Sequence, residues 1–292
     1  MTALHKELQS LLLPSGRTLA FAVFGKPKGL PVIYLHGFPT CRLEAIAFDA
    51  PARRANIRLI APDRPGIRQS SLAPDRSILD HAEDVRAFAL PKEMLTGVGI
   101  LSGMGTYEKN DVGLVPLGGR VTGWLARNAP RTLEYITDVF VAGLQRMVRW
   151  GWVERKIDQM PESSRKDKYD EGWTPVASRE RLLNNALEPS AQGSGGMAQE
   201  AALVSQPWGF KLDEVHYPVR IWHGVKDVNA PIEWIRAMAE KIPNRVLHVY
   251  EEGTHGGVMK YMDDVFSELL HEEKVEADQE GDNLRRRRMG VQ

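Results

Sequence analysis

The sequence predicts an α/β protein with a mostly parallel central sheet, flanked by helices and interrupted by a helical insertion. Short apolar runs without alternation, such as 31–35 and 57–61, are typical of strands buried on both faces of a sheet. Segments with helical periodicity alternate with these runs, as in a parallel sheet covered by helices. From about 106 to 206 the pattern changes to helices and loops, which indicates an insertion.

The strands are expected wherever an apolar run ends at a turn signal. Residues 19–25 follow a Ser15-Gly16 turn and are expected to form one arm of an antiparallel pair. The run 57–61 stops at Pro62-Asp63-Arg64-Pro65-Gly66, through which no helix could continue. The expected strands are 19–25, 31–35, 57–61, 95–101, 219–222 and 246–250.

The helices are expected where apolar residues recur at helical spacing between these strands. The expected helices are 48–56, 80–90, 133–157, 230–242 and 261–271. We therefore expect a core made of 1–105 and 207–273, a helical lid at 106–206, and a solvated tail at 274–292.

Composition excludes several classes of partner. Lysine plus arginine and aspartate plus glutamate both number 38, so net charge gives no reason to expect a nucleic acid or an anionic membrane. The single cysteine, Cys41, cannot form an intramolecular disulfide, which favours a reducing compartment. The sequence contains no run of about 18 apolar residues, which is the length needed to span a bilayer. We expect a soluble cytoplasmic protein.

Residues that could take part in catalysis follow the expected strands. His36, Gly37 and Phe38 follow the strand at 31–35, and Asp227 follows the strand at 219–222. His255 follows the last strand and is flanked by glycines. A turn or helix-capping aspartate and a surface loop histidine are the alternative interpretations of Asp227 and His255.

These motifs together resemble the α/β-hydrolase fold superfamily, in its capped branch that includes epoxide hydrolases and peptidases. The resemblance covers about 16–271 and rests on His36-Gly37, Asp63-Arg64-Pro65-Gly66 with Ser70, His223-Gly224 with Asp227 and Pro231, and His255. It implies that His255 is the base and Asp227 its orienting acid, and that His36, Gly37 and Phe38 form an oxyanion loop. It also implies no cofactor, and the sequence has no metal-ligand cluster or phosphate-binding glycine loop. Asp63, Arg64 and Ser70 are expected to brace loops, and Cys41 to pack in the core.

The nucleophile of such an enzyme is missing from the pattern. No serine has glycine at both i−2 and i+2, as the nucleophile elbow requires. Helix 80–90 is followed almost directly by 95–101, so a strand-elbow-helix unit of about 30 residues is absent relative to the family. If 95–101 takes the place of the missing strand, Ser102 becomes the best substitute nucleophile. The alternative is that Ser102, with bulky Ile100 at i−2, lies in a turn leading into the lid.

Three functions therefore stay open. The chain is a hydrolase of ester or amide bonds whose nucleophile is Ser102 or an activated water, a non-catalytic protein that binds a small ligand, or an enzyme of non-hydrolytic chemistry such as elimination or cyclisation. Aromatic residues in and beside the insertion favour a small apolar substrate, although core packing at helical spacing explains most of them. They are Trp124, Tyr135, Phe140, Trp150, Trp152, Trp173 and Trp208.

Overall fold

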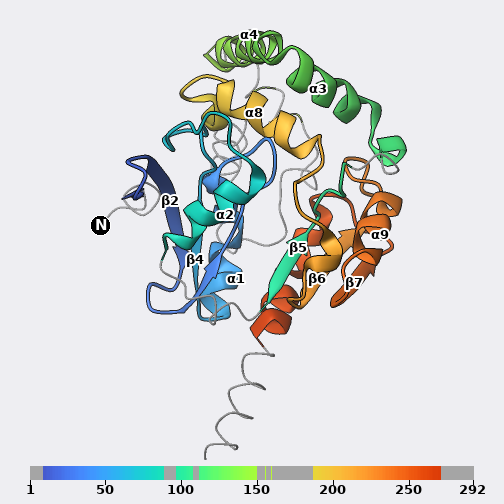
Figure 1. Cartoon of the computed structure of the whole chain (residues 1–292). Coiled ribbons are helices and arrows are strands. Elements are labelled where there is room, and N and C mark those ends of the chain that lie inside the picture. Colours follow the sequence, from blue (N-terminus) through green and yellow to red (C-terminus); the bar gives the residue numbers. More distant parts are fainter. Residues whose placement is uncertain are drawn as a thin grey trace, which may run out of the picture. The chain divides into compact units, whose positions relative to one another are not determined.

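The chain forms two compact units, each with its own sheet. The computed structural model describes residues 9–88, 97–107, 112–149 and 187–270, with the single residues 155 and 159. One unit contains residues 1–89 and 105–211, and the other contains 90–104 and 212–292. The alternation of helices and strands confirms the predicted α/β class (Figure 1).

The first unit contains a four-stranded sheet in the order β1-β2-β4-β3. Its strands are β1 (Gln9–Leu12), β2 (Thr18–Gly25), β3 (Leu30–Ile33) and β4 (Ile57–Pro62). β2 runs antiparallel to both β1 and β4, whereas β3 and β4 are parallel. The predicted antiparallel pair at 19–25 is thus confirmed, with Gly16 in the turn at φ +78°. Such a positive φ is readily adopted only by a residue without a Cβ.

Close backbone contacts fix the start of β4 against the end of β2. Gly25 has φ +73°, and a Cβ added to it would lie 2.2 Å from the carbonyl oxygen of Ile57. The amide of Gly25 also donates to Asp49 Oδ1 at 2.7 Å. A glycine is therefore required where β2 ends, beside the start of β4 and the Asp49 side chain.

The short helices of this unit differ in detail from the prediction. The helix expected at 48–56 is found as α1 (Asp49–Arg54), and a 3-10 helix that was not predicted, η2 (Arg42–Phe48), directly precedes it. The helix expected at 80–90 is α2 (Ile78–Arg86), which begins earlier because Ser77 and Asp80 form a reciprocal capping box. Residues 89 and 90 lie outside the described residues.

A group of helices completes the first unit. Its longer members are α3 (Leu117–Asn128), α4 (Pro130–Arg149) and α8 (Gly195–Val204), and two short 3-10 helices, η4 (Val112–Leu114) and η5 (Glu188–Ser190), accompany them. α8 lies alongside both α3 and α4 (Figure 1). Gly123 of α3 allows this approach, since a Cβ there would lie 2.5 Å from Ser205 Cβ. The assignment of 106–206 as a lid stays a prediction, because 105–211 belongs to the same unit as 1–89.

The second unit is a parallel three-stranded sheet in the order β5-β6-β7. Its elements are β5 (Val98–Leu101), η6 (Leu212–Glu214), β6 (Val219–Gly224), α9 (Ile232–Glu240), β7 (Arg245–Tyr250), η7 (Gly257–Tyr261) and helical residues 262–270. The whole of β6 is buried, including Trp222, and α9 contributes the buried side chains of Trp234 and Ile235. Each such side chain contributes about 1.5–3 kcal/mol when it is removed from water.

The sheet that the sequence predicts as continuous is therefore in two pieces among the described residues. β3 is the last strand of the first sheet, and β5 is the first strand of the second. Among the described residues β5 pairs with β6, and the possibility that 95–101 takes the place of the missing strand stays a prediction. Parallel strands usually have partners on both sides, so two such edges agree with the absence of an internal strand from the sequence.

Candidate active site

The Asp227 and His255 side chains meet on two loops of the second unit. Asp227 lies in the turn after β6, and His255 lies in the loop after β7. The loops touch through glycines, because a Cβ added to Gly224 would lie 2.2 Å from the carbonyl oxygen of Gly253. The backbone amide of Lys226 also donates to that carbonyl oxygen at 2.8 Å. The glycines of these two motifs thus bring the predicted acid and base together.

The Asp227 carboxylate is fully buried and surrounded by donors. Its Oδ2 accepts a 2.7 Å hydrogen bond from His255 Nδ1, while its Oδ1 accepts from the amides of Asn229 at 2.8 Å and Ala230 at 3.0 Å. Burial raises the pKa of Asp227, but these hydrogen bonds outweigh it and leave the pKa below its usual value. The turn interpretation therefore fits Oδ1, and the orienting role, for which Oδ2 is placed, stays a prediction.

The hydrogen bond to Asp227 assigns the tautomer of His255. Since a carboxylate only accepts, His255 carries its proton on Nδ1, and the basic lone pair is on Nε2. The His255 side chain is 44% exposed, in contrast to the buried acid. The pair therefore has the arrangement of an acid that orients a solvent-accessible base.

A second histidine lies behind the pair, and sequence reasoning gave it no role. His223 is completely buried; its Nε2 donates to the carbonyl oxygen of Ala230 at 2.7 Å and lies 3.4 Å from Asp227 Oδ2. Burial lowers the pKa of His223, so the ring is neutral and donates from Nε2. His223 therefore holds the turn that carries Asp227. The feature of the sequence that could have indicated this role is the place of His223 in the His223-Gly224 motif, shortly before Asp227.

Ser102 lies in the same unit and contacts the histidine loop. It follows β5 with φ +45°, and its amide continues the ladder by donating to the carbonyl oxygen of Trp222 at 3.0 Å. Its Oγ donates to the backbone carbonyl oxygen of His255 at 2.7 Å. The structure thus brings Ser102 close to His255, but its hydroxyl is bound to the backbone rather than to the imidazole.

The predicted oxyanion loop belongs to the first unit. The Gly37 amide donates to Glu44 Oε2 at 2.8 Å, and Thr40 Oγ1 donates to the same oxygen at 2.7 Å. Phe38 is 38% exposed. The Gly37 amide is therefore engaged by a carboxylate of its own chain, and the oxyanion role of His36, Gly37 and Phe38 stays a prediction.

His36 is buried, and both of its ring nitrogens form hydrogen bonds. Its Nδ1 donates to the carbonyl oxygen of Gly37 at 2.9 Å, and its Nε2 accepts from the Arg64 amide at 3.3 Å. Burial, reinforced by the Arg64 charge, lowers its pKa well below the usual value. His36 is therefore a neutral residue that shapes the loop.

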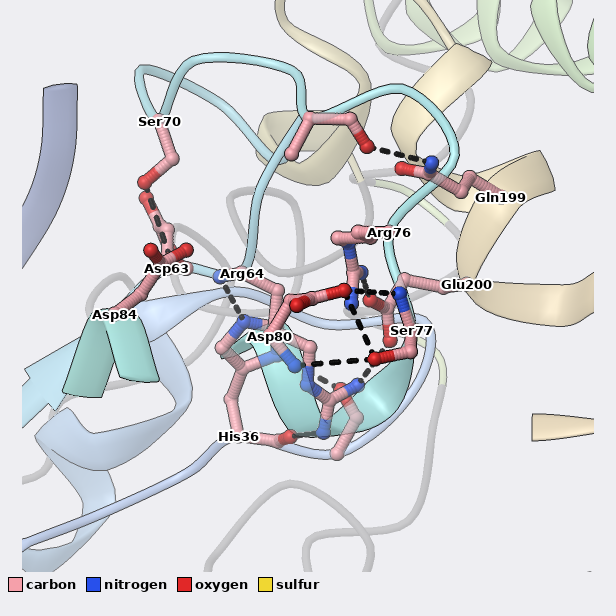
Figure 2. Close-up of polar contacts among 12 residues, drawn as sticks. His36, Asp63, Arg64, Ser70, Arg76, Ser77, Asp80, Asp84, Gln199 and Glu200 are labelled. Atoms are coloured by element: carbon pink, nitrogen blue, oxygen red, sulfur yellow. Dashed lines mark hydrogen bonds and ion pairs between the residues drawn. The ribbon is translucent and has the colours of Figure 1, made fainter. Parts of the chain in front are cut away.

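Figure 2 shows the network around this loop, which joins α8 to residues 63–77. Buried Glu200 pairs with Arg64 Nη1 at 2.9 Å and with Arg76, and Arg64 also donates to the carbonyl oxygen of His36. Ser70 Oγ donates to the carbonyl oxygen of Asp63 at 3.1 Å. These contacts are internal, as expected for loop-bracing residues, but Glu200 was missed because no local motif marks it.

Other candidate groups are accounted for by packing or lie elsewhere. Cys41 is fully buried against Leu43 and Ile67, and burial raises the pKa of its thiol to about 12. No group of three potential metal ligands gathers within the described ranges. Among the helices of that part of the chain, none is long and apolar enough to cross a membrane.

The aromatic residues of the insertion are more exposed than packing alone predicts. Trp124, Tyr135 and Phe140 are 57%, 70% and 65% exposed, although their helical spacing suggested a core. Trp208 contacts Phe210 with ring centroids 6.0 Å apart. The remaining aromatics named above, Trp150, Trp152 and Trp173, lie outside the described residues.

Comparison with known proteins identifies the fold through structure rather than sequence. No protein-family model matches the chain, and no curated protein matches it. Solved structures do match. An esterase from Rhodococcus sp. has 16% identity and a TM-score of 0.58, covering 90% of this chain and 98% of its own.

Two further structures agree with this match. A thioesterase domain from the curacin biosynthetic pathway has 14% identity and a TM-score of 0.55, covering 91% of this chain and 99% of its own. An α/β-hydrolase fold protein from Nakamurella multipartita has 16% identity and a TM-score of 0.53, covering 91% and 99%. The chain therefore has the α/β-hydrolase fold.

Proposed function

We propose that this α/β-hydrolase-fold chain is a hydrolase of ester or amide-type bonds in a small apolar substrate, with His255 as general base and Asp227 as its orienting acid. The observation that carries the proposal is the 2.7 Å hydrogen bond from His255 Nδ1 to the buried Asp227 carboxylate. A carboxylate held in this way fixes the imidazole ring and stabilises the imidazolium that forms when the base takes a proton.

The nucleophile in this proposal is a water molecule. His255 Nε2 takes a proton from water as its oxygen attacks the substrate carbonyl carbon. The imidazolium then returns that proton to the leaving alkoxide or amine as the tetrahedral intermediate collapses. One water is consumed, and an acid and an alcohol or amine are released. General base catalysis of this kind contributes about 10²–10⁴-fold.

Water is preferred to Ser102 because of the hydrogen bond that the serine makes. A serine nucleophile must give its proton to the base, but Ser102 Oγ donates to the His255 carbonyl oxygen at 2.7 Å. That contact supports a positioning role, in which Ser102 holds the loop that carries the base.

The choice of an apolar substrate rests on the sequence, in which aromatic residues gather in and beside the insertion at 106–206. The similar esterase and thioesterase structures guide the choice of test compounds, since both names refer to acyl transfer.

The experiment measures hydrolysis of p-nitrophenyl butyrate and octanoate by the full chain and by three variants. We expect His255→Ala and Asp227→Asn to lower kcat/KM by at least about 100-fold, because each removes part of the base. Ser102→Ala is expected to retain most of the activity and to show the same lack of labelling by a fluorophosphonate as the parent chain.

Each other outcome selects an alternative. Fluorophosphonate labelling that disappears in Ser102→Ala would identify the serine as nucleophile. Hydrolysis no faster than in buffer, with the chain folded by circular dichroism, would contradict the proposal and favour a ligand-binding protein. Turnover of another substrate class that requires His255 but no water would indicate elimination or cyclisation.

A further inference from the structure

A cleft of about 650 Å³ lies along α3, wholly within the first unit. Leu117, Val121 and Trp124 of α3 line it, together with Tyr107 and residues 205–207. This volume falls within the range of about 300–1,000 Å³ that small-molecule sites occupy. The unit that contains Asp227 and His255 contributes none of these residues, so the cleft is considered independently of the proposed hydrolysis.

One face of α3 supplies an apolar wall. Leu117, Val121 and Trp124 are spaced i, i+4 and i+7, which places them on a single side of the helix. They are 72%, 51% and 57% exposed, whereas Gly123 and Ala126 on another side are buried and Gly123 approaches Ser205. Three large apolar side chains pointing away from the helix packing therefore offer a surface that a ligand can cover.

The same face carries positive charge. Arg120 and Arg127 line the cleft, and none of its described lining residues is acidic. Arg127 is held in place, since its Nη1 donates to Ser205 Oγ at 2.7 Å and its guanidinium lies 5.5 Å from the Tyr107 ring centroid. Arg120 has no ion-pair partner among the described residues. The cleft thus combines apolar walls with one fixed and one uncommitted guanidinium.

We propose that this cleft binds a small amphipathic carboxylate, with its apolar body against Trp124, Val121 and Leu117 and its carboxylate at Arg120 and Arg127. A planar guanidinium matches the geometry of a carboxylate, and the apolar wall excludes a purely polar anion. The ligand class follows from this combination of charge and apolar surface.

The test is isothermal titration calorimetry of the full chain with sodium octanoate, 1-octanol and sodium acetate. Octanoate is expected to bind at one site, 1-octanol more weakly, and acetate not measurably. Arg120→Gln is expected to weaken octanoate binding about two- to fivefold, as an exposed charge pair would, and to leave 1-octanol unchanged. Trp124→Ala is expected to weaken both by about tenfold.

Matched control variants lie on α4, outside the cleft. Arg131→Gln and Phe140→Ala remove an exposed charge and an exposed aromatic ring without touching the cleft lining. Unchanged octanoate binding in both would support the site. Equal weakening by the α4 variants, equal affinity for octanoate and 1-octanol, or no octanoate binding by a chain folded by circular dichroism would overturn the proposal.

Discussion

Replacement of Glu200 by glutamine tests how strongly the buried network joins α8 to the loop at 63–77. The Glu200 side chain is 5% exposed, and its two partners, Arg64 and Arg76, are 19% and 4% exposed. Removing one partner of a buried ion pair costs about 3–5 kcal/mol, because the remaining charge is left in a poorly solvated site. Glutamine keeps one acceptor oxygen, so we expect a loss of about 3 kcal/mol.

The assay is amide hydrogen exchange, which separates the two units. A loss of about 3 kcal/mol corresponds to roughly 100-fold faster exchange through opening of α8 and of the described loop that it contacts. Amides in residues 212–270 belong to the other unit and are expected to change little. Circular dichroism on the same samples checks that the variant is folded.

The matched control is Glu188→Gln. Glu188 pairs with Arg68 at 2.7 Å, but its side chain is 28% exposed, so the loss is expected to be about 0.2–1 kcal/mol. If the two glutamine variants accelerate exchange equally, burial is not what gives the Glu200 network its strength. Equal acceleration in residues 212–270 would likewise refute the local effect argued here.

Three further predictions concern protonation, loop contact and reactivity. Burial and neighbouring guanidiniums lower the pKa of His81 to about 3. Below about pH 6.5 the unfolded chain therefore binds a proton at His81 that the folded chain does not bind. His36 and His223, whose pKa values are also lowered, add to the loss of stability on acidification, and the share of His81 is about 2 kcal/mol by pH 5. Urea titrations should therefore show that His81→Leu reduces the pH-dependent loss of stability by about this amount; an unchanged pH dependence would contradict it. Gly253→Ala should separate the acid and base loops, since its Cβ would lie 2.8 Å from Gly224 Cα, and should lower ester hydrolysis and weaken the low-field Nδ1–H resonance of His255. Gly256→Ala, with open space around its Cβ, is the control and should change neither. Cys41 should resist iodoacetamide at neutral pH until urea is added, and rapid native alkylation would show that its thiol is not buried.

The sequence predicts the strands well because a strand buried on both faces consists of a short run of apolar residues. β4 was expected at 57–61 and is found at Ile57–Pro62, where only Arg58 is exposed. The meeting of Asp227 and His255 was also predictable, since parallel strands end at one edge of a sheet and the flanking glycines let their loops approach. Local pattern and chain order were sufficient in both cases.

Long-range polar contacts were not predictable from spacing. Glu200 contacts Arg64 and Arg76, which lie 136 and 124 residues away in the sequence. A glutamate within a mostly apolar helical segment gives no sign of which distant arginine it will meet. Helix periodicity similarly predicted α4 but not which of its sides is covered, and Tyr135 and Phe140 proved to be exposed.

The Asp227–His255 pair assembles without the strand-elbow-helix unit, because the hydrogen bonds described for Asp227 and His223 are local to one sheet. The donors to Asp227 come from its own turn and from His255, and His223 holds that turn from within β6. None of these contacts needs a residue from the first unit. An intact pair is therefore no sign that a nucleophilic serine is also present. This is why fluorophosphonate labelling of the parent chain and of Ser102→Ala, rather than the geometry of the pair, decides between a water and a serine mechanism.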